Sequence, residues 1–249
     1  FALDEWDDLF LDEFDSIWMR KDPPVDESYL HATHILDLAG PETIVMNRPG
    51  GVRYANEKMY ALAFPEWIPE TLVTRSVQRI RRWLEEREEP LIVKPIDGHG
   101  GAGVFLLEKG DRNVSSILET ITNEGKRWVV VQAYLPEARN GDKRIIMING
   151  EPGGAILRVP QEDDNRGNIH VGGTVRATTL TARDLEICAA VGPRLRADGL
   201  YFVGLDVIGD YLTEINVTSP TGIREFKDLT GTDLGQTFVR WLEQASAGS

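Results

Sequence analysis

Residues 199–224, GLYFVGLDVIGDYLTEINVTSPTGIR, predict a β-hairpin that carries acidic side chains. The first half is apolar and β-branched and is interrupted by one charge at Asp206. A Gly-Asp turn follows, and a second short strand carries Glu214 and Asn216. Side chains two residues apart on a strand share a face, so Glu214 and Asn216 point the same way. Because carboxylate and carbonyl oxygens suit a hard divalent cation, the hairpin is a candidate metal site.

The connection between the two strands decides whether Asp206 joins that face. A plain two-residue turn would pair Ile208 with Tyr211 and would put Asp206 on the face opposite Glu214. A three-residue loop or a β-bulge shifts the pairing by one residue and brings Asp206, Glu214 and Asn216 together. We predict such a loop or bulge. From spacing alone, an ordinary hairpin with solvated acidic side chains remains the alternative.

Length and composition indicate a soluble globular protein with two lobes. The 249 residues exceed the usual size of one domain, and 41% are hydrophobic and 27% charged. No apolar run is long enough to span a membrane, and the net charge of −13 argues against nonspecific nucleic-acid binding. The single cysteine, Cys188, excludes an internal disulfide and fits a reducing compartment, so we expect a cytoplasmic location. Its apolar helical surroundings favour a buried side chain over a nucleophile.

Hydrophobic periodicity predicts alternating strands and helices. Residues 14–19 and 43–46 are expected strands around a helix over 26–39, a βαβ unit typical of the end of an α/β domain. Further helices are expected over 56–67, 76–88, 112–124, 181–197 and 232–245, and further strands over 71–74, 90–95, 104–107, 129–132, 144–149 and 153–159. Residues 161–176 are polar, glycine-rich and without periodicity, which is typical of a functional lid.

A glycine-rich loop, Gly98-His-Gly-Gly-Ala-Gly103, follows a strand that ends at Lys94. It matches the G-x-G-x-x-G pattern of dinucleotide-binding proteins, but a strand follows where that pattern requires a helix. A glycine-rich loop between two strands can still bind phosphates through its backbone N–H groups, and Lys94 can add a positive charge. An ordinary hairpin loop with a solvated lysine is the alternative. The sequence contains no Walker motif.

Other motifs are less informative when taken singly. Gln132-Ala-Tyr-Leu135 follows a buried strand and could read an adenine base through backbone groups, although a strand end closed by Pro136 is the simpler explanation. His31 and His34 stand at helical spacing without a third histidine or a cysteine nearby, which disfavours zinc. No G-x-S-x-G motif and no plausible acyl-enzyme triad occur.

Taken together, the motifs resemble an ATP-grasp ligase and, more closely, the bacterial-type glutathione synthetase family. The matching segments are Met19-Arg-Lys-Asp-Pro-Pro24, Asn56-Glu-Lys58, Thr71-Leu-Val-Thr-Arg75, Lys94-Pro95 with the glycine loop, Gly141-Asp-Lys-Arg144, Val203-Gly-Leu-Asp206 and Thr213-Glu-Ile-Asn-Val-Thr-Ser-Pro220. The resemblance covers essentially the whole chain. It implies a mixed α+β and α/β architecture, in which two ATP-grasp subdomains (56–131 and 132–249) follow the remnant of an N-terminal α/β domain (1–55).

The resemblance also implies a role for each candidate residue. Those expected to bind ATP are Lys58, Lys94, Gly100, Gly101, Gln132, Tyr134, Leu135, Asp142 and Asn216. Those expected to hold Mg²⁺, or Mn²⁺, are Asp206, Glu214 and Asn216. Those expected to act at the transferring phosphoryl group or on the lid are Arg158, Lys94 and Arg166. Those expected to contact a dipeptide are Arg20, Ser219 and Arg224.

The activity implied by the resemblance is the ATP-dependent joining of γ-glutamylcysteine to glycine through an acyl phosphate. Its expected partners are these small molecules and ATP, and the family implies a homo-oligomer. One alternative is another ATP-grasp carboxylate–amine ligase with a different acceptor. A second is a catalytically silent nucleotide-binding subunit.

Three features depart from the family pattern. The family has an additional N-terminal segment that this chain lacks, and the chain begins at Phe1 rather than at a methionine, so we expect a fragment. His99 stands where the family commonly has a bulkier nonpolar residue. The expected lid is acidic at Glu162-Asp163-Asp164.

Overall fold

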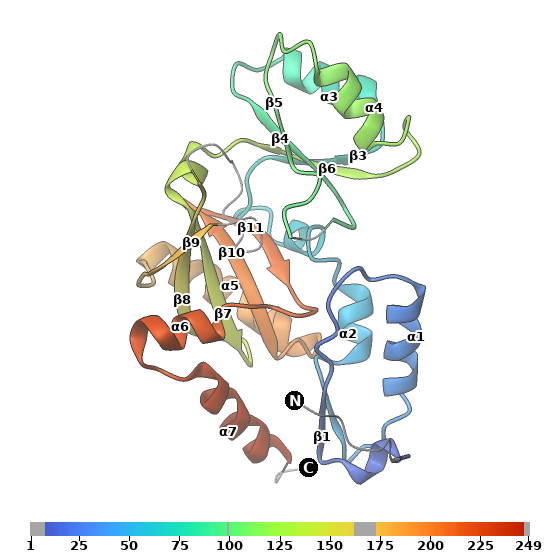
Figure 1. Ribbon diagram of the computed structural model, residues 1–249, viewed down its shortest axis with the longest axis vertical. Coiled ribbons are helices and arrows are strands. Elements are labelled where there is room, and N and C mark those ends of the chain that lie inside the picture. Colours follow the sequence, from blue (N-terminus) through green and yellow to red (C-terminus); the bar gives the residue numbers. More distant parts are fainter. Residues whose placement is uncertain (1–7, 99, 162–172, 247–249) are drawn as a thin grey trace.

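A computed structural model describes residues 8–98, 100–161 and 173–246. Within these residues the strands form three sheets of two, four and five strands. Figure 1 shows the four-stranded sheet at one end of the molecule and the five-stranded sheet in the middle. The N-terminal unit, which contains the two-stranded sheet, lies toward the other end. None of the described helices combines the length and the apolar character needed to cross a membrane.

The N-terminal unit is a βαβ unit, as the sequence predicts. It contains η1 (Leu11–Glu13), β1 (Ser16–Trp18), α1 (Glu27–Leu36), β2 (Ile44–Met46) and α2 (Pro49–Tyr54). β1 and β2 are parallel, with Ser16 opposite Ile44. α1 begins where the Asp26 carboxylate accepts a 2.8 Å hydrogen bond from the backbone of Tyr29, which satisfies a helix-terminal N–H group.

The four-stranded sheet has the order β3-β6-β4-β5, and its neighbouring strands are antiparallel. Its strands are β3 (Thr71–Thr74), β4 (Leu91–Pro95), β5 (Phe105–Leu107) and β6 (Val129–Ala133), and its helices are α3 (Val77–Glu85) and α4 (Val114–Ile121). Alternate residues such as Leu91 and Val93 pack with apolar side chains of α3 and α4. The residues between them, Ile92 and Lys94, therefore project from the opposite face.

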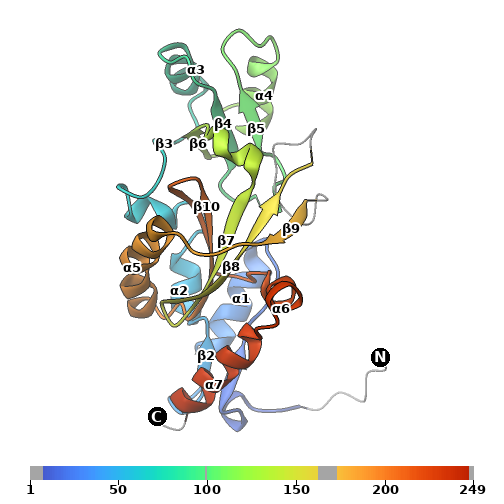
Figure 2. The same cartoon turned by 90° about the vertical axis from the view of Figure 1, so that its left-hand side faces the viewer.

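The five-stranded sheet has the order β11-β10-β7-β8-β9, again with antiparallel neighbours. Its strands are β7 (Asp142–Ile148), β8 (Glu151–Val159), β9 (Thr174–Ala177), β10 (Phe202–Ile208) and β11 (Tyr211–Asn216), and η3 (Pro136–Asn140) precedes β7. α5 (Ala182–Ala197) packs on the face that carries Ile145 and Val203. α6 (Ile223–Thr230) and α7 (Leu234–Ser246) pack on the face that carries Ile146 and Phe202 (Figure 2).

The sequence-based assignment is wrong over 56–67. This segment is a turn followed by a short 3₁₀ helix, η2 (Tyr60–Ala63), and the α-helix of this region is α2. The reason is competition for backbone groups. The Glu57 carbonyl, which a helix over 56–67 would pair with the backbone N–H of Ala61, accepts a hydrogen bond from Ile215 instead. That carbonyl is therefore not available to a continuous helix.

Two further elements differ from the sequence-based assignment. α6 was not predicted, and β9 occupies the end of the segment 161–176 that was expected to be a loop. β9 has only four residues, too few for alternation to predict a strand, and it is a strand because it pairs with β8, with Thr174 opposite Val159. Residues 162–172 of the expected lid lie outside the described part of the chain.

Asn47 joins the N-terminal unit to the five-stranded sheet. Its buried side-chain amide donates to the carbonyls of Phe202 and Val217 at 2.9 and 2.8 Å. Its oxygen accepts from the backbone of Tyr201 and Phe202 at 2.7 and 2.8 Å. One side chain thus satisfies four backbone groups at the junction.

Replacing Asn47 with alanine should leave those four backbone groups without their partner. We expect the free energy of unfolding to fall by about 3 kcal/mol, because a buried polar group without a partner is costly. Urea denaturation measures this change. Asn140→Ala, at an exposed position at the end of η3, is the control and should cost less than about 0.5 kcal/mol. Equal effects of the two substitutions would contradict the assigned role.

Candidate active site

A cavity lies between the four-stranded and the five-stranded sheet. The four-stranded sheet contributes the face opposite its helices, and the five-stranded sheet contributes the face on which α6 and α7 pack. The lining includes Lys58, Ile92, Lys94, Gly98, Gly100, Gly101, Gln132, Tyr134, Leu135, Asp142, Arg144, Arg158, Asp206, Thr213, Glu214 and Asn216. Apart from Arg166, every residue that the sequence analysis assigned to ATP, to a metal or to the phosphoryl group is therefore in one place.

The hairpin of β10 and β11 contains the β-bulge predicted from its sequence. Its turn is the two-residue type, since Ile208 pairs with Tyr211 and Val207 with Leu212. The register then shifts, and Asp206 pairs with Glu214. Thr213 is the extra residue. Asp206, Glu214 and Asn216 consequently share one face, and the Asn216 amide donates to Asp206 at 3.1 Å.

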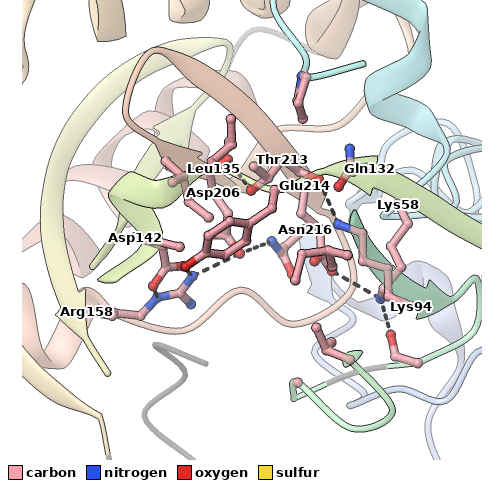
Figure 3. Close-up of a pocket in the computed structure, with 18 of the residues that line it drawn as sticks. Lys58, Lys94, Gln132, Leu135, Asp142, Arg158, Asp206, Thr213, Glu214 and Asn216 are labelled. Carbon is pink, nitrogen blue, oxygen red and sulfur yellow. Dashed lines mark hydrogen bonds and ion pairs between the residues drawn. The ribbon is translucent and has the colours of Figure 1, made fainter. Parts of the chain in front are cut away.

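Two buried arginines hold Asp206, and Figure 3 shows one of them, Arg158, beside Asp142. Arg144 donates from Nε and Nη2 to the two carboxylate oxygens of Asp206 at 2.5 and 3.0 Å. Arg158 Nη2 lies 3.0 Å from Asp206 Oδ2 and also donates to Asp142. The arginines are 5% and 3% exposed, so these pairs are screened little by water. Arg144, Arg158, Asp142 and Asp206 form what we call the arginine–aspartate cluster.

The charges of this cluster shift the pKa values of its members. Burial alone would raise the pKa of Asp206, but Arg144 and Arg158 more than offset burial and hold this pKa well below its usual range. Burial raises the pKa of Asp142, and Arg158, which it shares with Asp206, offsets this only in part. Burial likewise opposes the charge of Arg158, yet Asp206 and Asp142 raise its pKa. Asp206 is therefore an anion and Arg158 a cation at neutral pH.

Two buried lysines face the cluster from the other side of the cavity. Lys58 Nζ donates to the carbonyl of Gly98 and lies 3.4 Å from Glu214 Oε1. Lys94, near the end of β4, donates to the carbonyl of Thr213 at 3.3 Å. Burial lowers the pKa of Lys94, and the charge of Glu214 opposes that shift. The lysines thus connect the glycine loop and the four-stranded sheet to β11.

The glycine loop and the strand end after β6 complete the cavity. The loop joins the antiparallel strands β4 and β5, as the sequence predicts, and Gly100 and Gly101 have φ values of 60° and 79°. Only glycine adopts such backbone angles without strain. Gln132 lines the cavity and donates to the hydroxyl of Thr71 at 3.0 Å. Tyr134 and Leu135 follow it along the same wall.

The residues assigned to a dipeptide do not all lie together. Arg20 Nη2 lies 3.5 Å from the hydroxyl of Ser219 and donates to the Pro220 carbonyl at 3.0 Å, so these two predicted residues meet. Burial lowers the pKa of Arg20. Arg224 lies exposed on the first turn of α6. Arg166 and His99 lie outside the described residues.

Known proteins match this chain over nearly its whole length. The model of the prokaryotic glutathione synthetase ATP-grasp domain matches residues 57–231, and that of the N-terminal domain of the same family matches residues 1–53. A glutathione synthetase from Thermosynechococcus vestitus is 54% identical over 93% of this chain and 73% of its own length. The chain belongs to the prokaryotic glutathione synthetase family. A second glutathione synthetase, from Gloeobacter violaceus, is 56% identical with the same coverage.

A solved structure outside the glutathione synthetase family shares the fold. D-cycloserine synthetase matches this chain with a TM-score of 0.70 at 16% sequence identity, over 94% of this chain and 86% of its own. At this identity the likeness concerns the fold alone. Together with the family model, it confirms the ATP-grasp fold that the sequence predicts for this glutathione synthetase family member.

Sequence reasoning missed Arg144, which lines the cavity. The motif Gly141-Asp-Lys-Arg144 was recognised, but only Asp142 was assigned to the cavity. Residues 142 and 144 lie on the same face of β7, so strand alternation could have found the arginine. Lys143, on the other face, forms an ion pair with Asp184 of α5. Of these three consecutive charged residues, Asp142 and Arg144 therefore face the cavity and Lys143 faces α5.

Without Arg144, the buried carboxylate of Asp206 should keep only Arg158 as an arginine partner. We expect Arg144→Gln to lower the free energy of unfolding by about 3 kcal/mol at neutral pH, because breaking a buried ion pair leaves an incompletely compensated charge. Urea denaturation measures the loss. The double variant Arg144→Gln/Asp206→Asn should recover part of it. Additive effects would contradict the pairing.

The loss caused by Arg144→Gln should also depend on pH. The pKa of Asp206 is depressed in the folded protein, so its stabilisation is fully present above the unfolded-state pKa and is lost as pH falls toward the folded-state value. The difference between the native protein and the variant should therefore narrow as pH falls through about 4. A difference that widens would contradict this.

Proposed function

We propose that this chain joins γ-glutamylcysteine to glycine with ATP, and releases glutathione, ADP and phosphate. The observation that carries the proposal is the convergence of two lysines and two arginines on the hairpin acids in one cavity, in a chain of the glutathione synthetase family. In this reaction a carboxylate attacks the γ-phosphate although both are negative. Cations around the transferring group offset that repulsion.

Residues on both sides of the cavity bind ATP. Lys58 and Lys94 contact the phosphates, and Gly100 and Gly101 cover them with backbone N–H groups. The strand end at residues 132–135 holds adenine, and Asp142 lies near the ribose. The two lysines already join the two sheets through Gly98, Thr213 and Glu214, which supports their assignment to the same ligand.

The hairpin face fits Mg²⁺, and Mn²⁺ as a substitute. Asp206 and Glu214 offer carboxylate oxygens from directly paired positions, and Asn216 offers an amide oxygen beside them. Among the described residues no three histidine, cysteine, aspartate or glutamate side chains form a metal-binding group. Mg²⁺ is usually held by one or two carboxylates together with substrate phosphates and water, and the paired carboxylates of Asp206 and Glu214 match that requirement. When bound, the ion neutralises charge on the phosphates.

The remaining residues act on the reacting groups. Arg158 grips the transferring phosphoryl group, and Arg144 is its partner on β7. Arg20 and Ser219 contact the dipeptide, and Arg224 and Arg166 remain assigned to the dipeptide and to the lid. The acyl phosphate formed in the first step is attacked by the amine of glycine. Burial of the cluster supports a site that keeps water away from that intermediate.

The proposal extends to organisation and location. Residues 1–55 form the substrate-side unit, 56–131 the small ATP-grasp subdomain, and 132–249 the large subdomain with the metal site. The partners are small molecules, and nucleic acid and membranes are not among them. A homo-oligomer in the cytoplasm is the expected state of the protein.

Release of ADP from ATP tests the activity. We expect release only when γ-glutamylcysteine and glycine are both present, with glutathione as the product. Release with another amine in place of glycine would identify a different ATP-grasp ligase, and binding of ATP without release would identify a silent subunit.

Glu214→Gln should keep the fold, as circular dichroism measures, and lose at least about 100-fold in turnover, since it removes a carboxylate ligand of Mg²⁺. Near-normal turnover of this variant would overturn the metal assignment.

Arg158→Lys should affect turnover more than ATP binding. A guanidinium grips two phosphoryl oxygens at once and an ammonium does not, and the demand is greatest when charge spreads over those oxygens during transfer. We expect kcat to fall by about tenfold or more, which corresponds to about 1.4 kcal/mol. The Kd of ATP should change little, because stabilisation confined to the transition state leaves ground-state binding unchanged.

The control for Arg158→Lys is Arg176→Lys. Arg176 is exposed on the neighbouring strand β9, opposite Leu157. It should keep both kcat and the Kd of ATP. Unchanged kcat in both Arg158→Lys and Arg158→Ala would retire the catalytic role and leave Arg158 as a structural partner of Asp142.

A further inference from the structure

Glu57 stands next to Lys58 and holds the end of β11. Its Oε1 atom accepts hydrogen bonds from the backbone of Val217 and Thr218 at 2.9 and 3.0 Å, and from the Thr218 hydroxyl at 2.8 Å. Its backbone carbonyl accepts another from Ile215 at 3.0 Å. One residue therefore binds the last part of β11 and the start of the segment that connects it to α6. We call residues 217–222 the connecting segment.

Two other charged side chains anchor the connecting segment further along. Arg20 donates to the carbonyl of Pro220, and Arg144 donates to that of Thr221 at 3.2 Å. Both arginines also contact other groups under the proposed function. Arg20 contacts the dipeptide, and Arg144 contacts the carboxylate of Asp206 beside the phosphoryl group. Glu57 differs from them. Its carboxylate oxygen Oε1 accepts three hydrogen bonds from the connecting segment itself.

Glu57 is also tied to the four-stranded sheet through its neighbours. The Asn56 side chain donates to the Ile96 carbonyl, directly after β4, at 3.3 Å. Lys58 donates to the Gly98 carbonyl in the glycine loop. The three residues Asn56, Glu57 and Lys58 thus connect the phosphate side of the cavity with the connecting segment.

We infer that Glu57 is a positioning residue, which fixes the connecting segment relative to Lys58 and so keeps the dipeptide side of the site in register with the phosphate side. The inference rests on the proposed function. A carboxylate that accepts several N–H and O–H groups makes strong, charge-assisted hydrogen bonds. When ligands engage Arg20 and Arg144, these bonds remain and hold the segment in place.

Hydrogen exchange tests the anchoring without any substrate. In Glu57→Ala the amides of Val217 and Thr218 lose their acceptor, and we expect their exchange to accelerate by about tenfold or more, because a local opening becomes cheaper. Glu57→Gln keeps an acceptor oxygen at the same reach and should accelerate exchange less. Glu66→Ala, at an exposed position in the same linker, is the matched control and should leave both amides unchanged. Unchanged exchange in Glu57→Ala would overturn the anchoring.

Kinetics and binding test the positioning role. We expect Glu57→Ala to raise the KM of γ-glutamylcysteine by about tenfold, while the Kd of ATP, measured by calorimetry, stays within about twofold. In Glu57→Gln the KM of γ-glutamylcysteine should stay close to that of the native protein. An equal loss of ATP binding and dipeptide binding would mean a general loss of structure and would overturn the role.

The outcomes separate this inference from the proposed function. A native protein that forms no glutathione overturns the proposed function, and with it the kinetic role of Glu57, whatever the exchange rates are. A native protein that forms glutathione, together with a Glu57→Ala variant of normal KM, overturns the inference alone. If Glu57→Ala does not fold, the same comparison is made with Thr218→Val, which removes one of the three hydrogen bonds to the Glu57 carboxylate. This variant should raise the KM of γ-glutamylcysteine and leave the Kd of ATP unchanged, and a normal KM would overturn the role.

Discussion

The β-bulge at Thr213 is the constraint on which the site depends. In a regular hairpin with the observed turn, Glu214 would pair with Leu205 and would enter the apolar layer beneath α5. The bulge places Glu214 opposite Asp206 instead and sends Ile215 into that layer. Because a carboxylate in an apolar layer is costly and an isoleucine there is stabilising, the fold and the site require the same bulge.

The arginine–aspartate cluster follows from the face that the bulge completes. Strand alternation brings Asp142 and Arg144 from β7, Arg158 from β8 and Asp206 from β10 to one side of the sheet. Because these side chains are buried, the charge of each one is compensated mainly by the others. Removing one partner therefore leaves a buried charge that is only partly compensated. Under the proposed function, a phosphate or a cation would replace a partner in some of these pairs. The proposed function thus assigns ligand binding to the same ion pairs that stabilise the fold.

Several described side chains connect the two sheets. Lys58 and Lys94 reach from one sheet to the other, and the segment that begins at Asn56 connects both. Glu57 belongs to this connection and extends it to the segment before α6. The cavity therefore lies between two sheets that these side chains connect.

The sequence by itself determined the sheet-forming segments, the glycine loop between strands and the acidic hairpin, because each depends on local alternation, turn chemistry or backbone freedom. It also carried a signal for the bulge: Leu212 and Ile215 are both apolar but three residues apart, and a regular strand cannot bury both on one face. The tertiary structure decided what depends on distant partners. The segment 56–67 is not a continuous helix because the Glu57 carbonyl accepts a hydrogen bond from Ile215, and β9 exists because β8 pairs with it. Arg144 became part of the site because Asp206, 62 residues away, lies beside it across the sheet.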